Sequence, residues 1–353
     1  MIDLFRKFIS VFIIVLLSFV RACALGADDI SAECAVVITA QTGEVIFAKN
    51  ADKKHSMAST TKIMTSLLAV ESGRLSDEIK VDREMLNVEG TSMGLLGGDS
   101  VSLKELVYGM LLPSGNDAAE VTALYLGGSE ADFAKMMNGR AKSIGMKNTN
   151  FVTPSGLDDE NHYSTAYDMA LLGREAVKNP VFLSICSSQS AVLTYGNPPY
   201  ARRLTNHNRL LSSYDGALGI KTGFTKKSGR CLVSYAQRDG VGLIAVTLND
   251  GNDWEDHRQM LDYGFSVVSG CKPKLKLPEK MAVVGGKTDA VNLCAEDFTL
   301  ESTAENVTYL YYLPHFLYAP VRAGDTVGKI EVYSDGKMIG EISVTTADSV
   351  NVK

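Results

Sequence analysis

Apolar residues along the chain follow two periodicities, and their order predicts an α/β protein. Apolar-rich runs at residues 34–39 and 45–49 flank a polar segment at 41–44, a pattern typical of a β-hairpin. After Lys62 the apolar residues take helical spacing, which ends at Gly73. Further helices are expected at 103–112, 118–126, 131–144, 165–177 and 254–268, and further strands at 217–222, 231–236 and 243–248. This order predicts an α/β sandwich whose sheet is completed from both chain ends.

The pattern changes near residue 272. Residues 272–278 are basic and contain two prolines, which is typical of a linker. Beyond it Asp335-Gly336 indicates a hairpin turn. Short alternating stretches follow the linker at 282–284, 307–312, 329–333 and 341–345. We therefore expect a large N-terminal α/β domain over 25–271, a linker over 272–278 and a small all-β domain over 279–353.

The first residues have the three parts of a secretory signal. Arg6 and Lys7 precede an apolar stretch at 8–20, and Ala22-Cys23-Ala24 offers a small-x-small cleavage site. The apolar stretch is shorter than the ~20 residues that span a bilayer. We expect residues 1–24 to be a signal peptide, with an uncleaved N-terminal anchor as the alternative. Either way the protein is predicted to work outside the cytoplasm.

Composition excludes several classes of protein. The chain has 353 residues with 45% hydrophobic and 22% charged content, so it is an ordinary globular protein, long enough for two domains. Its formal net charge of −6 gives no electrostatic basis for binding nucleic acid. The cysteines are widely spaced without a C-x-x-C pair, and the five histidines lack ligand spacing. We predict neither a metal site nor a cofactor.

Three short motifs carry candidate chemistry. Ser59 and Lys62 stand three residues apart at the start of a helix, which puts hydroxyl and amine on one face. A partly desolvated lysine can remove the proton of a serine and so make it a nucleophile. Ser114-Gly115-Asn116 lies between two helical stretches, and Lys221-Thr222-Gly223 ends a predicted strand. The set S-x-x-K, S-x-N and K-T-G, in this order, is typical of penicillin-binding proteins and class A β-lactamases.

Over about residues 31–268 the sequence resembles the serine-type D-alanyl-D-alanine carboxypeptidases, the low-molecular-mass penicillin-binding proteins. Besides the three motifs, the resemblance rests on stretches at 90–94, 112–119, 154–157 and 162–168. It implies a β-lactamase/transpeptidase-like α/β sandwich with an antiparallel sheet. The tail, with Ala319-Pro320-Val321, looks like the C-terminal domain of that family. The implied reaction removes the terminal D-alanine from peptidoglycan stem pentapeptides during cell-wall remodelling, with β-lactams as inhibitors.

The resemblance also implies catalytic roles. Ser59 attacks the carbonyl of the penultimate D-alanine and becomes the acyl-enzyme. Lys62 is its general base, and Ser114 relays the proton toward the departing D-alanine.

Five further residues are implied to bind the substrate. Asn116 orients Lys62 and the substrate amide, while Lys221 supplies positive potential. Thr222 holds the terminal carboxylate, and Gly223 lets the substrate backbone approach closely. The backbone N–H groups of Ser59 and Phe224 hold the oxyanion.

One position departs from the family. Many members carry an arginine near the substrate carboxylate, eleven positions before the glycine that aligns with Gly264, and Asp253 stands there in this chain. Arg258 is a candidate substitute.

Competing interpretations of other residues are weaker. Ser92 lies in a G-x-S-x-G sequence without the strand and helix that a hydrolase elbow needs. His162 and Asp168 are expected to form structural hydrogen bonds. For the whole protein, the alternatives are a β-lactamase with the same motifs and a non-catalytic wall-binding protein that docks through the β domain. For the carboxypeptidase too, the β domain is expected to make peripheral contact with the membrane or wall.

Overall fold

The computed structural model describes residues 25–271, 275–296, 300–303, 307–334 and 336–353. The expected signal peptide, the first part of the expected linker and Asp335 of the expected hairpin turn therefore lie outside the described residues. Within these ranges an antiparallel sheet in the order β2-β1-β9-β8-β7 forms the centre of the larger part of the chain. Its strands are β1 (Cys34–Thr39), β2 (Val45–Lys49), β7 (Ala217–Thr225), β8 (Gly229–Arg238) and β9 (Val241–Leu248). Strands from residues 34–49 and 217–248 complete one sheet, as the sequence predicts.

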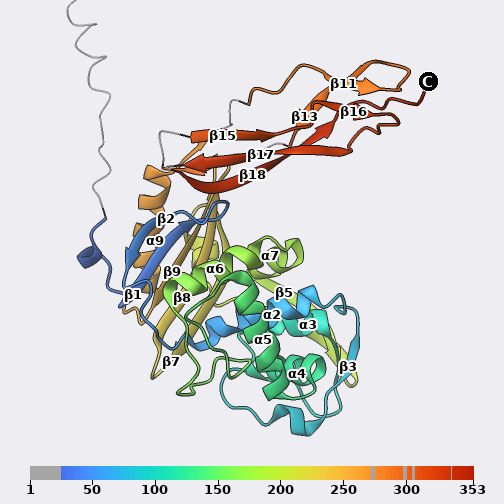
Figure 1. The fold of residues 1–353 in the computed structure, drawn as a ribbon. Helices are drawn as coiled ribbons and strands as arrows, with labels where there is room; N and C mark the ends of the chain where they lie inside the picture. The colour runs from blue at the N-terminus through green and yellow to red at the C-terminus, as the bar shows by residue number, and fades with distance from the viewer. Residues whose placement is uncertain (1–24, 272–274, 297–299, 304–306, 335) are drawn as a thin grey trace, which may run out of the picture.

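Helices cover both faces of this sheet (Figure 1). In β1, Val36 and Ile38 belong to the core shared with the main helical layer, whereas Ala35 and Val37 belong to the core shared with the last helix. Because side chains alternate along a strand, a strand buried on both faces must lie in a middle layer. The helices are α2 (Lys62–Glu71), α3 (Leu103–Leu111), α4 (Asn116–Gly127), α5 (Glu130–Ile144), α6 (Ala166–Val177), α7 (Pro180–Cys186), α8 (Leu210–Ser213) and α9 (Asp253–Val267).

Local sequence signals fix where these helices begin and end. Ser102 and Glu105 form a reciprocal capping box at the start of α3, and the Thr165 side chain accepts from Asp168 N at the start of α6. Gly128 and Gly145 end α4 and α5 in the left-handed conformation. Short 3₁₀ helices occupy η1 (Ala27–Asp29), η2 (Ala58–Thr61) and η3 (Arg83–Leu86).

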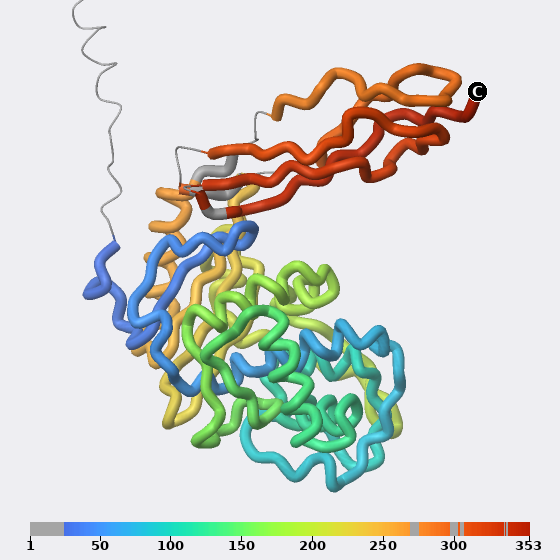
Figure 2. The backbone as a smooth tube through the Cα atoms, in the orientation of Figure 1, coloured from blue at the N-terminus to red at the C-terminus, as the bar shows by residue number. Residues whose placement is uncertain are grey.

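The C-terminal part is all β, in agreement with the prediction. Its strands are β11 (Met281–Val284), β12 (Ala290–Val291), β13 (Leu293–Ala295), β14 (Leu300–Ser302), β15 (Val307–Tyr312), β16 (Phe316–Tyr318), β17 (Thr326–Ser334) and β18 (Lys337–Thr346). Two apolar clusters support it, one centred on Ile330 and Ile342 and the other on Val283 and Val350. This part forms an elongated arm beside β1 and β2 (Figure 2).

Three strand pairings were not expected from sequence. Strand β10 (Ser269–Cys271) follows α9 and pairs with β14 of the arm. A hairpin of β5 (Ser190–Gly196) and β6 (Pro199–Thr205) also forms, as does β3 (Glu78–Lys80) with β4 (Ser100–Ser102). Every helix within the described ranges is too short or too polar to span a bilayer.

Candidate active site

A 3₁₀ turn presents Ser59 at the entrance to helix α2. Thr60 donates two hydrogen bonds to the carbonyl of Met57, from its backbone nitrogen at 3.2 Å and from Oγ1 at 2.6 Å. Ala58 takes a φ of 48°, an uncommon value for a residue with a side chain. Ala58, Thr60 and Thr61 are buried, whereas Ser59 is partly exposed. The turn is thus fixed on both sides of one accessible hydroxyl.

Lys62 lies beneath this hydroxyl and is fully buried. Its Nζ is 2.9 Å from Ser59 Oγ and donates to the carbonyl of Ser155 at 2.8 Å. Burial lowers the pKa of Lys62 well below its usual value, the positive charge of Lys221 lowers it further, and Asp117 opposes both. A neutral amine within hydrogen-bond distance of a serine hydroxyl is a competent general base.

Ser114 occupies the turn between α3 and α4 with a φ of 65°. Thr91 Oγ1 donates to the Ser114 carbonyl at 2.5 Å, and Asn116 N donates to the Thr91 carbonyl at 2.7 Å. The Asn116 side chain donates from Nδ2 to the Glu89 carbonyl at 2.6 Å. Strained backbone held by such bonds is common at functional sites.

Strand β7 forms the opposite wall. Lys221 is buried, donates to the carbonyl of Thr222 at 2.9 Å, and has its pKa lowered by burial to about 7. Gly223 passes so close to the nucleophile turn that a Cβ added there would lie 3.1 Å from Ser59 N. A side chain at this position would therefore push the strand away from Ser59.

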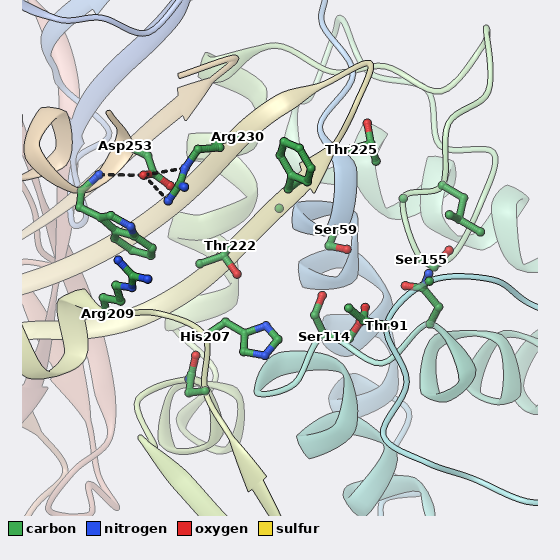
Figure 3. Close-up of a pocket in the computed structure, with 18 residues that line it drawn as sticks. Ser59, Thr91, Ser114, Ser155, His207, Arg209, Thr222, Thr225, Arg230 and Asp253 are labelled. Atoms are coloured by element: carbon green, nitrogen blue, oxygen red, sulfur yellow. Dashed lines mark hydrogen bonds and ion pairs between the residues drawn. The ribbon is translucent and has the colours of Figure 1, made fainter. Parts of the chain in front are cut away.

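These elements enclose a cavity of about 770 Å³ (Figure 3). The predicted site residues that line it are Ser59, Ser114, Asn116, Thr222, Gly223 and Phe224. Figure 3 places Ser59, Ser114 and Thr222 around one opening, with His207 between the last two. The two lysines lie buried behind this lining, so the fold brings all three motifs together.

One predicted contact does not form. The hydrogen bonds of Asn116 run to Glu89 and Thr91, and those of Lys62 run to Ser59 and Ser155. Within the described residues Asn116 therefore does not hold Lys62 by a hydrogen bond. The carbonyl of Ser155 does so instead, and a backbone group leaves no signal in the sequence.

His162 supports the loop that carries Ser155. Its Nε2 is 2.8 Å from Thr61 Oγ1, and its Nδ1 accepts from Val152 N at 2.9 Å. Burial lowers the pKa of His162 to about 4, which keeps Nδ1 an acceptor at neutral pH. His162 therefore forms structural hydrogen bonds, as the sequence predicts.

Two other polar residues have structural positions. Asp168 Oδ2 accepts from Asn148 N at 2.7 Å and Thr149 Oγ1 at 2.7 Å. Ser92 Oγ donates to Asp117 at 2.5 Å, and Asp117 also accepts from the backbone nitrogen of Met93. Asp117 was missed by sequence reasoning, although its place directly after S-x-N could have drawn notice.

A basic and aromatic end of the cavity was also missed, with Arg209, Arg230, Asp253 and Trp254 in its lining. Arg258 points elsewhere: its Nε is 3.4 Å from Glu255 and its Nη1 donates to the Ser213 carbonyl. Among the described residues, no group of three or more His, Cys, Asp and Glu side chains is placed to hold a metal ion.

A buried lysine beside a partly exposed serine, in this α/β sandwich, defines an active-site serine enzyme of the penicillin-recognising class. The family model for D-alanyl-D-alanine carboxypeptidases matches residues 21–252, and the model for the C-terminal domain of penicillin-binding protein 5 matches residues 273–352. The chain belongs to the D-alanyl-D-alanine carboxypeptidase family, and it is a serine-type enzyme of that kind.

Relatives of known activity and solved structures support the same family. D-alanyl-D-alanine carboxypeptidase DacF of Bacillus subtilis is 32% identical over 90% of this chain and 86% of its own length. DacC of Escherichia coli is 32% identical over 92% of this chain and 85% of its own length. Penicillin-binding protein 5 of Haemophilus influenzae has a TM-score of 0.68 at 28% identity, covering 91% of this chain and 98% of that one. A β-lactamase or a non-catalytic wall-binding protein is not favoured by these relationships.

Proposed function

We propose that Ser59 is the nucleophile, Lys62 its general base and Ser114 the proton relay of a DD-carboxypeptidase reaction. The observation that carries this proposal is the 2.9 Å distance between Lys62 Nζ and Ser59 Oγ, with the lysine fully buried. Burial favours the neutral amine, which is the form that accepts a proton.

In acylation, Ser59 Oγ bonds to the carbonyl carbon of the penultimate D-alanine while its proton passes to Lys62. Collapse of the tetrahedral intermediate breaks the peptide bond. The proton then moves from Lys62 through Ser114 to the amine of the departing D-alanine. The wall position of Ser114 in the same opening supports this path.

In deacylation, water attacks the ester carbonyl and gives its proton to Lys62. That proton returns to Ser59 Oγ as the ester bond breaks, so the enzyme is regenerated. The peptide leaves one D-alanine shorter.

Asn116, Lys221, Thr222, Gly223 and Phe224 are proposed to bind the substrate. The backbone N–H groups of Ser59 and Phe224 would hold the oxyanion, because preorganised donors stabilise developing charge. Buried Lys221 contributes a positive field from behind the wall. The substrate is proposed to be the peptidoglycan stem pentapeptide, and β-lactams to acylate the same serine.

The site of action is proposed to be the cell envelope, outside the cytoplasm, after export directed by residues 1–24. The arm formed by residues 279–353 is proposed to contact the wall or the membrane surface. Exposed aromatic side chains on the arm, Tyr312, Phe316 and Tyr318, support a contact role.

Mass spectrometry after incubation with benzylpenicillin tests the nucleophile. We expect one adduct, mapped to the peptide that contains Ser59 and lost in Ser59→Ala. Ser92→Ala is the matched control and should label normally. An adduct on Ser92, or labelling that persists in Ser59→Ala, would contradict the assignment.

A further inference from the structure

The cavity extends past Thr222 to an end that carries permanent positive charge. Arg209 and Arg230 both line this end, and their guanidinium carbons lie 6.0 Å and 5.8 Å from the centre of the Trp254 ring. Lys221 does not reach this end, since it is buried behind the cavity wall and its Nζ donates to the Thr222 carbonyl. An arginine keeps its charge at any pH of interest.

Arg230 is held in place by a buried carboxylate. Asp253 Oδ1 accepts from Arg230 Nε at 3.0 Å and lies 2.7 Å from its Nη2. The Asp253 side chain is 5% exposed, whereas that of Arg230 is 44% exposed. Among the described residues Arg230 Nη1 has no hydrogen-bond partner. Arg230 is therefore preorganised on one side and open to the cavity on the other (Figure 3).

The register of the sheet places Arg230 next to Thr222. Phe224 of β7 pairs with Arg230 of β8, and Thr222 pairs with Leu232. Arg230 is thus the diagonal neighbour of Thr222 on the same face of the sheet. Diagonal neighbours lie about 7–8 Å apart, within reach of a long side chain. A planar group held between the Thr222 hydroxyl and the Arg230 guanidinium would fill that space.

We propose that Arg230 binds the α-carboxylate of the terminal D-alanine of the substrate, and that Asp253 is its positioning residue. This inference rests on the proposed function, because a carboxypeptidase substrate carries its free carboxylate on the residue that departs. Arginine and carboxylate match as a bidentate pair, and the unpaired Nη1 is available for it. Arg230 then makes the enzyme specific for a peptide end over an internal bond.

The pairing with Asp253 also explains the departure from the family at that position. Here the helix position carries a carboxylate, and the positive charge stands on the neighbouring strand instead. Both arginines are exposed, and Arg209 is the weaker candidate because it forms no ion pair within the described residues, whereas Arg230 pairs with Asp253.

A pair of thioester substrates separates recognition from chemistry. The first is an N-acyl-D-alanyl thioester with a free terminal carboxylate, and the second is its methyl ester. For Arg230→Gln we expect kcat/KM to fall about 10- to 100-fold on the carboxylate, the scale of a charge-assisted hydrogen bond, and to change less than about 3-fold on the methyl ester. Arg230→Lys should recover part of the loss.

Two control variants separate carboxylate binding from effects on the fold. Arg258→Gln, on the same helix as Asp253, should leave kcat/KM unchanged on both thioesters. The double variant Arg230→Gln with Asp253→Asn removes the uncompensated buried carboxylate, and it should keep the loss of discrimination while regaining thermal stability.

Equal losses on both substrates, or the same selective loss from Arg209→Gln with Arg230→Gln unaffected, would overturn the proposal. Failure of the proposed function looks different: the unaltered enzyme would hydrolyse neither thioester and would give no penicillin adduct on Ser59.

Discussion

Lys62 Nζ donates a 2.8 Å hydrogen bond to the carbonyl oxygen of Ser155, which lies 93 positions away in the sequence. A neutral amine has two hydrogens and one lone pair. With one hydrogen committed to Ser155, the rotation of the amine is restricted and its lone pair can face Ser59 Oγ, 2.9 Å away. The loop carbonyl therefore orients the base for the nucleophile.

Lys62→Arg should lower the rate of acylation by penicillin about 100-fold or more, the scale of losing a general base. The guanidinium keeps the positive charge and the donors but cannot give up its proton at neutral pH. Stopped-flow measurement of acyl-enzyme formation checks this. Lys49→Arg, which also alters a lysine bonded to a backbone carbonyl, that of Ile30, is the control and should acylate normally. Near-normal acylation by Lys62→Arg would assign the base elsewhere.

Ser114→Gly should stabilise the protein by about 1 kcal/mol while acylation falls at least ~10²-fold. The φ of 65° at Ser114 costs a residue with a side chain more than it costs glycine, and the hydroxyl is the proposed relay. Asp239→Gly is the matched control, because Asp239 has a φ of 48° in the turn between β8 and β9. It should stabilise the fold similarly and leave acylation unchanged. Urea unfolding and acylation rates are measured on both variants, and a destabilised Ser114→Gly would contradict the strain argument.

Acid should destabilise the fold through His162. Its pKa is about 4 in the folded protein against about 6.5 in an unfolded chain, so the unfolded state binds more protons between these values. The stabilising contribution is present above pH ~6.5 and is lost as the pH falls to ~4, by up to about 3 kcal/mol.

His162→Gln should reduce this acid-dependent loss, measured by urea unfolding at about pH 7 and about pH 4.5. Exposed His315→Gln is the control, because it alters no buried hydrogen bond. Parallel pH curves for the unaltered protein and His162→Gln would show that His162 does not carry the effect.

A chain shortened to residues 25–268 should fold and cleave a small D-alanyl-D-alanine peptide with kcat/KM within about 3-fold of the full chain. Every residue proposed for catalysis or binding precedes residue 268, and a tail of short strands is better suited to docking than to chemistry. The end at 268 also removes β10, which would otherwise lose its partner β14. Turnover of intact sacculi should fall instead. Normal penicillin binding without turnover of the small peptide would contradict this division.

Sequence alone determined the chemistry-bearing residues and most of the elements that carry them. Ser59 and Lys62 are close because three positions span one helical turn, and that relation is local. Helix α3 begins at Leu103 as expected, since Ser102 and Glu105 cap it through side chains that the sequence displays. Local periodicity and capping are encoded within a few residues.

Tertiary structure alone decided which groups hold these residues in place. The Ser155 carbonyl that orients Lys62 is a backbone atom, and every residue has one, so no residue type marks it. Arg230 and Asp253 are 23 positions apart and meet because the first residues of β8 lie beside the first turn of α9, which depends on the packing of a helix on a sheet. Such contacts form only when segments distant in sequence are packed together. Local sequence patterns do not show which distant segments will meet.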